Sequence, residues 1–410
     1  MSMMTYYNKM RFAGLTRRTS FLLISFLAFL SSGCKPKERN LQLKQLWRAP
    51  IFESSEGTAE SIYPLQVGDM AITAKLLDNF VPAFYAMDMK QGGILWQVTD
   101  TSCTGKVYYN MAPYISKHGM VVPCGGALKS IDIKTGKSLW TYQYSGNPEQ
   151  FLEPYTNYTI LQAVNDWDER KSHIYEVNSK NGEAKSIYSV SWPDSSKLLI
   201  RTPVKVNDTQ VLFTSITMRY GSNETHAKWH LLNSNTHEIN LEGVAYPANK
   251  DGYGVTKQPI IMGDKAYLVA YDNAFCISTK DGKELWRKAL PRDMLTSVPI
   301  ASKDGLFCPM EDGNLYKLSL DEGDIIWKTE ISTTPSRPII VNDYLFIVGG
   351  SDGILYIIST KDGGTVKSMK APNHHFIKNQ FFRRSIGVDS EGEILILFDG
   401  NSFRGYKIWQ

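Results

Sequence analysis

The sequence lacks the features that most enzymes and nucleic-acid-binding proteins need. Its five cysteines include no Cys-x-x-Cys pair and no two in adjacent positions, which argues against a cysteine-based metal or redox site. The histidine pairs His226/His230 and His374/His375 have no cysteine or carboxylate frame at ligand spacing, so zinc is not expected there. We therefore expect no catalytic residues, no metal and no cofactor.

An excess of charge of one sign is also missing once the N-terminus is set aside. Residues 1–33 hold four of the 45 basic residues and no acidic residue, so 41 basic and 41 acidic residues remain in the rest of the chain. A neutral balance argues against nucleic acid as a partner. No stretch rich in proline, glycine or serine divides the chain, and we expect residues 42–410 to form one domain.

The one apolar run, Phe21–Leu30, is too short to cross a bilayer. It follows basic residues and precedes small residues and Cys34, which indicates an export signal and resembles the bacterial lipobox. We predict a signal peptide over 1–33, lipidation of Cys34 and a tether over 34–41. Lys35 after the cysteine resembles the outer-membrane address of bacterial lipoproteins. We therefore expect the protein to be anchored at the periplasmic face of the outer membrane. A plain secretory signal or an uncleaved anchor is the alternative.

A short sequence motif recurs along the chain, and we call it the phrase. It consists of a turn, glycine, two or three residues, an aliphatic residue and Trp. An alternating apolar and polar strand precedes each full copy of the phrase. A self-similar unit of short strands and tight turns predicts a β-propeller, and the Trp side chains should pack between neighbouring blades. The predicted blade-docking residues are Trp47, Trp96, Trp140, Trp286 and Trp327.

The number of blades follows from the spacing of these phrases. Two units in which this phrase is degenerate, which we call the worn blades, fit between Trp140 and Trp286. A seventh unit follows the phrase that ends at Trp327. Residues 42–48 look like an isolated last strand, and the two C-terminal strands have no strand after them. We predict that the chain ends share one blade and close a ring of eight four-stranded antiparallel blades, which removes open sheet edges. We expect this propeller to be a monomer.

The cysteines after Cys34 permit disulfides, since their number is even and the protein is expected to be exported. Cys103 with Cys124 and Cys276 with Cys308 are the natural candidates because each pair is close in sequence. The alternative is that they are small buried apolar side chains.

The two worn blades have enlarged polar hairpins, at residues 165–171 and 219–226. Trp, Tyr and Arg are the residue types that anchor interfaces, and long loops on a rigid scaffold often carry function. The predicted partner-binding residues in these hairpins are Trp167, Asp168, Arg170, Arg219 and Tyr220. Drift of surface loops is the alternative.

The repeat of aromatic, Ala or Ser, aliphatic and Asp, then Thr-Gly-Lys and Leu-Trp, resembles the pyrroloquinoline-quinone-type propeller repeat over residues 42–410. Among exported proteins with this repeat, size, the lipobox and the eight blades favour the propeller lipoprotein of the outer-membrane β-barrel assembly machinery. That resemblance implies a membrane-tethered scaffold, without enzymatic activity, that binds an envelope protein such as the barrel-assembling membrane protein.

Two other functions stay open at this point. A quinoprotein dehydrogenase would need two adjacent cysteines, which the sequence lacks. A propeller of this size could instead bind a small ligand or a polysaccharide in its central channel, and the sequence does not locate that channel.

Overall fold

A computed structural model gives the architecture of most of the chain. It describes residues 41–50, 65–76, 81–100, 113–149, 152–249, 256–294, 297–372, 380–381, 386–389, 391–400 and 402–409. Cys34, Cys103 and the predicted signal peptide lie outside these residues. Leu41–Gln410 forms one compact unit, and every regular element described in it is a β-strand. Within the described ranges there is no helix with the length and apolarity that crossing a membrane requires.

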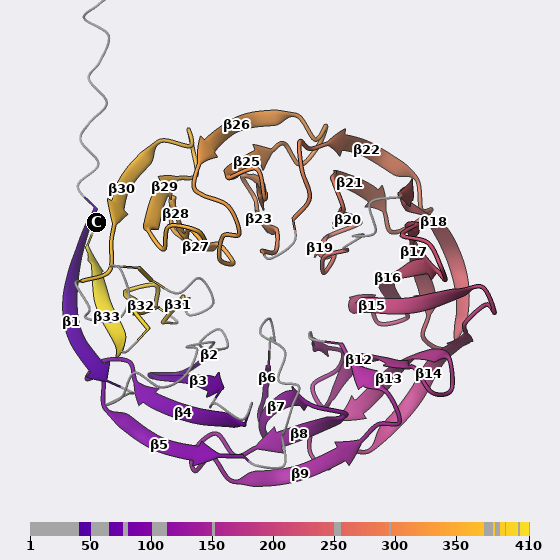
Figure 1. Cartoon of the computed structure of the whole chain (residues 1–410), viewed down its shortest axis with the longest axis horizontal. Coiled ribbons are helices and arrows are strands. Elements are labelled where there is room, and N and C mark those ends of the chain that lie inside the picture. Colours follow the sequence, from indigo (N-terminus) through magenta and orange to yellow (C-terminus); the bar gives the residue numbers. More distant parts are fainter. Residues whose placement is uncertain are drawn as a thin grey trace, which may run out of the picture. The chain divides into compact units, whose positions relative to one another are not determined.

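The strands form eight antiparallel sheets, which are the blades of a ring (Figure 1). Blade 1 contains β2 (Leu65–Val67), β3 (Met70–Leu76), β4 (Pro82–Asp88) and β5 (Ile94–Thr99). Blade 2 contains β6 (Tyr114–Ser116), β7 (Gly119–Cys124), β8 (Ala127–Ile131) and β9 (Ser138–Gln143). Blade 3 contains β10 (Asn147–Pro148), β11 (Glu153–Pro154), β12 (Thr159–Asp166), β13 (Lys171–Asn178) and β14 (Ala184–Ser191). Blade 4 contains β15 (Ser196–Asn207), β16 (Gln210–Arg219), β17 (Thr225–Asn233) and β18 (Glu238–Asn249).

The second half of the ring repeats this order. Blade 5 contains β19 (Ile260–Met262), β20 (Lys265–Ala270), β21 (Asn273–Ser278) and β22 (Glu284–Ala289). Blade 6 contains β23 (Ile300–Ser302), β24 (Gly305–Pro309), β25 (Asn314–Leu318) and β26 (Ile325–Glu330). Blade 7 contains β27 (Ile339–Val341), β28 (Tyr344–Val348), β29 (Leu355–Ser359) and β30 (Thr365–Met369). Blade 8 contains β31 (Gly387–Val388), β32 (Ile394–Phe398), β33 (Ser402–Trp409) and β1 (Gln42–Pro50).

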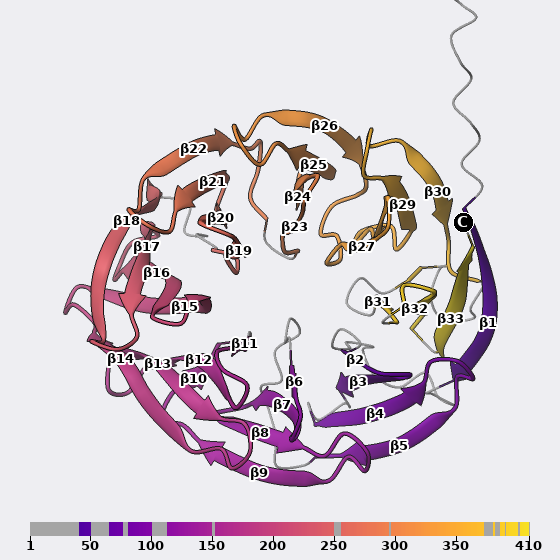
Figure 2. The ribbon, with the colours of Figure 1, turned by 180° about the vertical axis from the view of Figure 1, so that it is seen from behind.

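Each blade places its first strand near the centre of the ring and its fourth strand at the rim, as both views show (Figures 1 and 2). Blade 3 differs because two short strands, β10 and β11, both pair with β12. In blade 8 the rim strand is β1, which pairs with β33 from Gln42 opposite Trp409 to Pro50 opposite Ser402. The prediction of eight blades closed by the two chain ends is confirmed.

Turns alternate between the two faces of the ring because neighbouring strands in a blade are antiparallel. The first–second and third–fourth turns lie on one face, where β1 also begins at Gln42 and β33 ends at Trp409. We call this the N-terminal face. The second–third turns and the connections between blades lie on the other face, which we call the opposite face.

The five predicted Trp residues each reach from a rim strand to the next blade. Their indole N–H groups donate to backbone carbonyls, Trp47 to Met89 (2.6 Å), Trp96 to Ile133 (2.9 Å), Trp140 to Ser179 (3.1 Å), Trp286 to Leu320 (3.0 Å) and Trp327 to Thr360 (3.3 Å). Beneath each ring is a glycine of the next third–fourth turn. Gly323 has a φ of 72°, and a Cβ built on it would lie 2.4 Å from the ring of Trp286. Glycine is therefore needed for two reasons: the turn requires a positive φ, and the indole leaves no space for a Cβ atom.

The seam between blades 4 and 5 is filled by a Trp that the repeat did not predict. Trp229 lies on β17, the third strand of its blade, and is 4% exposed. It faces Gly243 on the rim strand, where a Cβ would lie 2.6 Å from the indole. Its ring extends to Gly282, where a Cβ would lie 2.9 Å away. The indole thus fills from an inner strand the space that a rim Trp fills elsewhere.

The prediction of a bridge between Cys276 and Cys308 is wrong. Both are buried free thiols, and burial raises the pKa of Cys276 to about 11. They lie on β21 and β24, which belong to neighbouring blades, so closeness in sequence does not place them side by side in one sheet. Both thiols belong to one apolar cluster between blades 5 and 6. Cys124, at the end of β7, is disulfide-bonded.

Candidate functional site

Three segments of blades 3 and 4 meet on the opposite face of the ring. They are the β12–β13 turn, the connection from β14 to β15, and the β16–β17 turn. The backbone N–H of Trp192 in the connection donates to the carbonyl of Arg170 in the first turn (2.8 Å). The N–H of Tyr220 in the second turn donates to the carbonyl of Ser195 (2.9 Å). The connection therefore fixes the two hairpins relative to each other.

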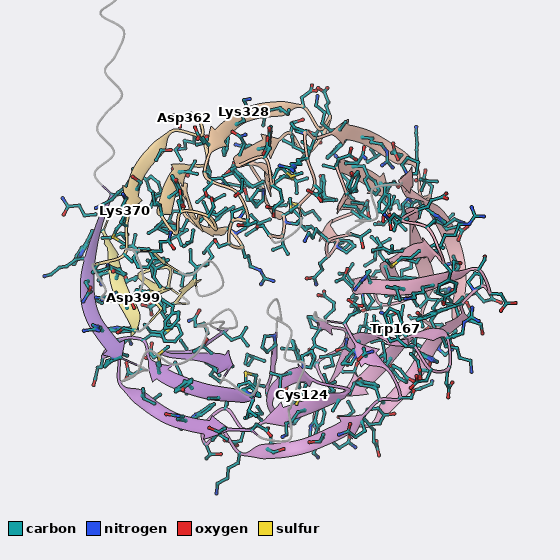
Figure 3. All side chains as sticks on the ribbon, viewed as in Figure 1. Cys124, Trp167, Lys328, Asp362, Lys370 and Asp399 are labelled. Carbon is teal, nitrogen blue, oxygen red and sulfur yellow. The ribbon has the colours of Figure 1, made fainter. Side chains whose placement is uncertain are left out.

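Aromatic and cationic side chains gather where these segments meet. We call the group Trp167, Arg170, Trp192, Lys197 and Tyr220 the blade 3–4 patch; Figure 3 labels Trp167 in this sector. Trp167 and Tyr220 are each 43% exposed. The ring of Trp167 stands at 90° to that of buried Trp192, with centroids 5.3 Å apart. The Lys197 ammonium lies 4.4 Å from the Trp167 ring and 5.8 Å from the Tyr220 ring, so it links the two exposed aromatics.

Arg170 is held in place by the connection between the blades. Its Nη2 donates to the carbonyl of Pro193 (2.7 Å), and its Nη1 lies 3.5 Å from a carboxylate oxygen of Asp194. Its guanidinium carbon is 5.7 Å from the centre of the Tyr220 ring. Arg170 also has a φ of 55°, a conformation that is uncommon for a residue with a side chain. The patch thus presents a cation whose position is set by backbone contacts.

The structure gathers Trp167, Arg170 and Tyr220 from the predicted partner-binding residues into this patch. Asp168 and Arg219 are exposed in the same two turns, and Arg219 forms an ion pair of 3.6 Å with Glu224. Sequence reasoning missed Trp192 and Lys197, which lie outside the two enlarged hairpins. A Trp directly before a proline, between two strands, was the available signal for the first of these.

Buried polar groups support the patch from below. The indole N–H of Trp192 donates to Ser172 Oγ (2.9 Å), which lies 2.7 Å from Asn165 Oδ1. Asn165 accepts a bond from the Ile200 N–H (2.9 Å) and donates to the Ile200 carbonyl (3.2 Å). The amide of Asn165 on blade 3 therefore pairs with β15 of blade 4 as a strand residue would.

The same amide connects the patch to an ion pair nearer the centre of the ring. Asn165 Nδ2 donates to Glu149 Oε1 (2.7 Å), and Arg201 Nη1 donates to both oxygens of Glu149, each at 2.6 Å. The two exposed aromatics thus stand on a seam joined by hydrogen bonds from the rim side to the inner strands. Such support reduces the ordering needed when a partner binds.

Three residues of blade 4 resemble a hydrolase triad. Ser215 Oγ lies 2.8 Å from His230 Nε2, and His230 Nδ1 lies 3.2 Å from Glu242 Oε2. Burial lowers the pKa of His230 to about 4, although Glu242 opposes this shift. Ser215 is only 3% exposed, and the neighbouring ring of Phe213 packs against Tyr188 of blade 3. Ser215 and His230 are buried, whereas the Glu242 side chain is 47% exposed, and the three residues make contacts across the neighbouring strands β16, β17 and β18.

One catalytic motif is present in the sequence but lacks the geometry that catalysis would require. Residues 349–353 spell Gly-x-Ser-x-Gly, but they join strands β28 and β29, whereas a nucleophile elbow joins a strand to a helix. Among the residues that the structure describes, no group of three or more His, Cys, Asp and Glu side chains could hold a metal ion.

The closed ring with Trp–glycine seams defines a β-propeller of the pyrroloquinoline-quinone repeat type. A family model described as outer membrane protein assembly factor BamB matches residues 43–153 and 228–375, and the chain belongs to this family.

Relatives agree with this assignment. An outer membrane protein assembly factor BamB from Yersinia pestis is 24% identical over 297 residues, which cover 66% of this chain and 68% of that one. A second, from Shewanella oneidensis, is 28% identical over 116 residues, 27% of this chain and 28% of that one.

Solved structures share the fold. BamB from Moraxella catarrhalis aligns with a TM-score of 0.58 at 13% identity, over 89% of this chain and 100% of that one. A europium-containing methanol dehydrogenase aligns with a TM-score of 0.58 at 11% identity, over 87% of this chain and 84% of that one. At such identities the likeness concerns the fold alone.

The family match leaves residues 154–227 uncovered, and the whole blade 3–4 patch lies there. It also ends before strands β31–β33 of blade 8, so it covers blades 1, 2, 5, 6 and 7 and parts of the other three. It assigns no role to the patch, whose function has to be argued from its own side chains.

Proposed function

We propose that this protein is a lipid-anchored scaffold at the periplasmic face of the outer membrane, which binds an envelope protein during the assembly of outer-membrane proteins. Membership of the assembly-factor family supports the process. The predicted signal peptide over 1–33, the lipidated Cys34 and the tether over 34–41 supply the location. The single domain over 42–410 supplies the scaffold, and the proposed role needs no cofactor and no covalent step.

The observation that carries a protein-binding role is the pair of half-exposed aromatics held over a buried network. Trp167 and Tyr220 present large apolar surface, and the turns that carry them are bonded through Arg170 and Tyr220 to the connection between blades 3 and 4. Residues of these types dominate the binding energy of protein interfaces, at ~2 kcal/mol or more for each central anchor. Lys197 between the two rings would pair with a carboxylate of the partner.

The test is capture of envelope proteins by the full chain carrying both Trp167→Ala and Tyr220→Ala, after crosslinking in membranes. We expect the main crosslinked partner to be lost while the melting temperature stays close to that of the wild type. Leu95→Ala is the control, because Leu95 is 55% exposed but lies on the rim strand β5 of blade 1. Unchanged capture by the double variant would refute this binding site.

A further inference from the structure

The described chain begins beside an exposed Trp. Gln42 at the start of β1 is paired with Trp409 at the end of β33, so both lie on the N-terminal face. Trp409 is 50% exposed, whereas Trp47 in the same blade is 8% exposed. The indole of Trp409 is therefore not used to seal a seam between blades.

Two lysines lie on the strands next to this indole. Lys407 Nζ lies 5.2 Å from the Trp409 ring and 2.8 Å from a carboxylate oxygen of Glu393. Exposed Lys44 is paired directly with Lys407 across β1 and β33. Like charges in directly opposite positions destabilise a sheet; Glu393 offsets the charge of Lys407, and a bound anion would do the same for Lys44.

A second exposed aromatic on the same face also carries a lysine. Tyr158 is 53% exposed in the β11–β12 turn, and Lys117 Nζ from the β6–β7 turn lies 3.9 Å from the centre of its ring. The rings of His118 and Tyr158 are stacked, with centroids 6.4 Å apart. Both turns are first–second turns, and so both belong to the N-terminal face.

Several other lysines on this face form ion pairs within the protein. Lysines and aspartates of the turns form ion pairs at Lys90–Asp69 (2.8 Å), Lys280–Asp264 (2.5 Å), Lys265–Asp321 (2.8 Å) and Lys361–Asp343 (2.6 Å). The lysines next to Trp409 and Tyr158 are thus distinguished by their aromatic neighbours.

We propose that the N-terminal face rests on anionic lipid headgroups, which Trp409 and Tyr158 contact together with Lys44 and Lys117. Trp and Tyr favour the membrane–water boundary, where their rings are partly apolar and partly polar, and nearby lysines attract anionic lipid. This inference rests on the proposed lipid anchor at Cys34. A tether of eight residues spans at most about 28 Å when fully extended, which keeps the start of β1 near the lipid surface.

The orientation has a consequence for the proposed binding site. The blade 3–4 patch lies on the opposite face, because its segments are second–third turns and a connection between blades. When the N-terminal face of the ring contacts the lipid, the blade 3–4 patch faces the periplasm. Soluble domains of a partner can reach it there.

The experiment places a fluorophore on each face of the full acylated chain in vesicles of phosphatidylethanolamine and phosphatidylglycerol. Single variants Trp409→Cys, Tyr158→Cys and Tyr220→Cys are labelled and exposed to a lipid with a nitroxide quencher on its headgroup. Cys276 and Cys308 are fully buried and are spared by labelling of the folded protein. We expect loss of fluorescence at positions 409 and 158 and none at position 220.

Equal loss at all three positions, or no loss at 409 and 158, overturns the inference. Two controls are flotation of the protein with the vesicles and the mass of the acylated chain. They distinguish the absence of the lipid contact from a failure of the anchor. If an acylated chain floats without loss at 409, the lipid-facing surface is refuted and the anchor stands. If the chain is not acylated and does not float, the tether and this inference fail together, while capture of a partner by the blade 3–4 patch is still decided by its own assay.

Charge variants give a second measurement that does not need the anchor. In the Cys34→Ser chain, Lys44→Gln and Lys117→Gln should each weaken binding to phosphatidylglycerol vesicles about fivefold, as expected for one lysine at an anionic surface. Lys328→Gln is the control, since Lys328 is on the rim strand β26. Equal weakening by all three variants contradicts a specific lipid-facing surface.

Discussion

Trp47 and Gly405 come from opposite ends of the chain and lie directly opposite each other in blade 8. A Cβ on Gly405 would lie 2.2 Å from Cε2 of Trp47. The indole cannot withdraw easily, because its N–H donates to the Met89 carbonyl of blade 1 at 2.6 Å. Closure of the ring therefore depends on a residue without a side chain.

Gly405→Ala should destabilise the protein by about 1–3 kcal/mol, the usual cost of overpacking a filled site. Urea unfolding measures this change. Gly93→Ala is the control, because a Cβ at Gly93 has no atom within 4 Å. If the two variants unfold at the same urea concentration, the contact between Trp47 and Gly405 does not limit closure.

Trp286→Ala should lower the free energy of unfolding by about 3–5 kcal/mol, since it empties a seam between two blades. Trp286 is 7% exposed and bonds to Leu320 of the next blade. Trp409→Ala, at a half-exposed Trp, should change stability far less. Thermal or urea unfolding compares the two, and an unchanged Trp286→Ala variant would remove this indole from the core.

Asn165→Ala should release the seam beneath the blade 3–4 patch. The change leaves the N–H and carbonyl of Ile200 without the amide that pairs with them, at a cost of about 1–3 kcal/mol. Hydrogen exchange should become faster at Ile200 in particular. Asn207→Ala, in an exposed turn of blade 4, is the control. Equal protection of Ile200 in both variants would show that Asn165 does not hold the seam.

Glu153 should make stability depend on pH near neutrality. Burial raises its pKa to about 7, and a hydrogen bond from Gln258 opposes that shift. The folded state holds this proton more tightly than the unfolded state, so the contribution of Glu153 is complete below pH 4.5 and is lost as pH rises through 7.

Glu153→Gln removes this dependence. Relative to the wild type, the variant should gain up to about 3 kcal/mol of stability between pH 4.5 and pH 7.5, since each pKa unit corresponds to ~1.4 kcal/mol. Unfolding by urea across this range measures the difference. A constant difference between the two proteins would mean that Glu153 titrates normally in the fold.

The ring could be predicted because its signal is local. A glycine in a third–fourth turn and a Trp four residues later recur in blades 1, 2, 5 and 6, and both are fixed by contacts that repeat from blade to blade. The worn blades were harder, since Ile187-Tyr188 stands where Leu-Trp is expected and His237 takes the turn conformation with a φ of 62°. Even there, strand alternation was enough to place β12, β13, β16 and β17.

The free state of Cys276 and Cys308 and the full composition of the patch could not be predicted from the sequence, for one reason. Both depend on which strands of different blades face each other. Cys276 and Cys308 are near in sequence but lie on separate sheets, whereas Trp192 completes a cluster with two hairpins that are 52 residues apart at Trp167 and Arg219.

What the sequence determined by itself is the repeating unit, the number of blades and the sharing of one blade by the chain ends, because periodicity and turn chemistry act over a few residues. Only the tertiary structure decided which side chains meet across the seams. It assembled Trp167, Lys197 and Tyr220 on one face and left Trp409 and Tyr158 on the other, since the direction of each strand assigns every turn to a face.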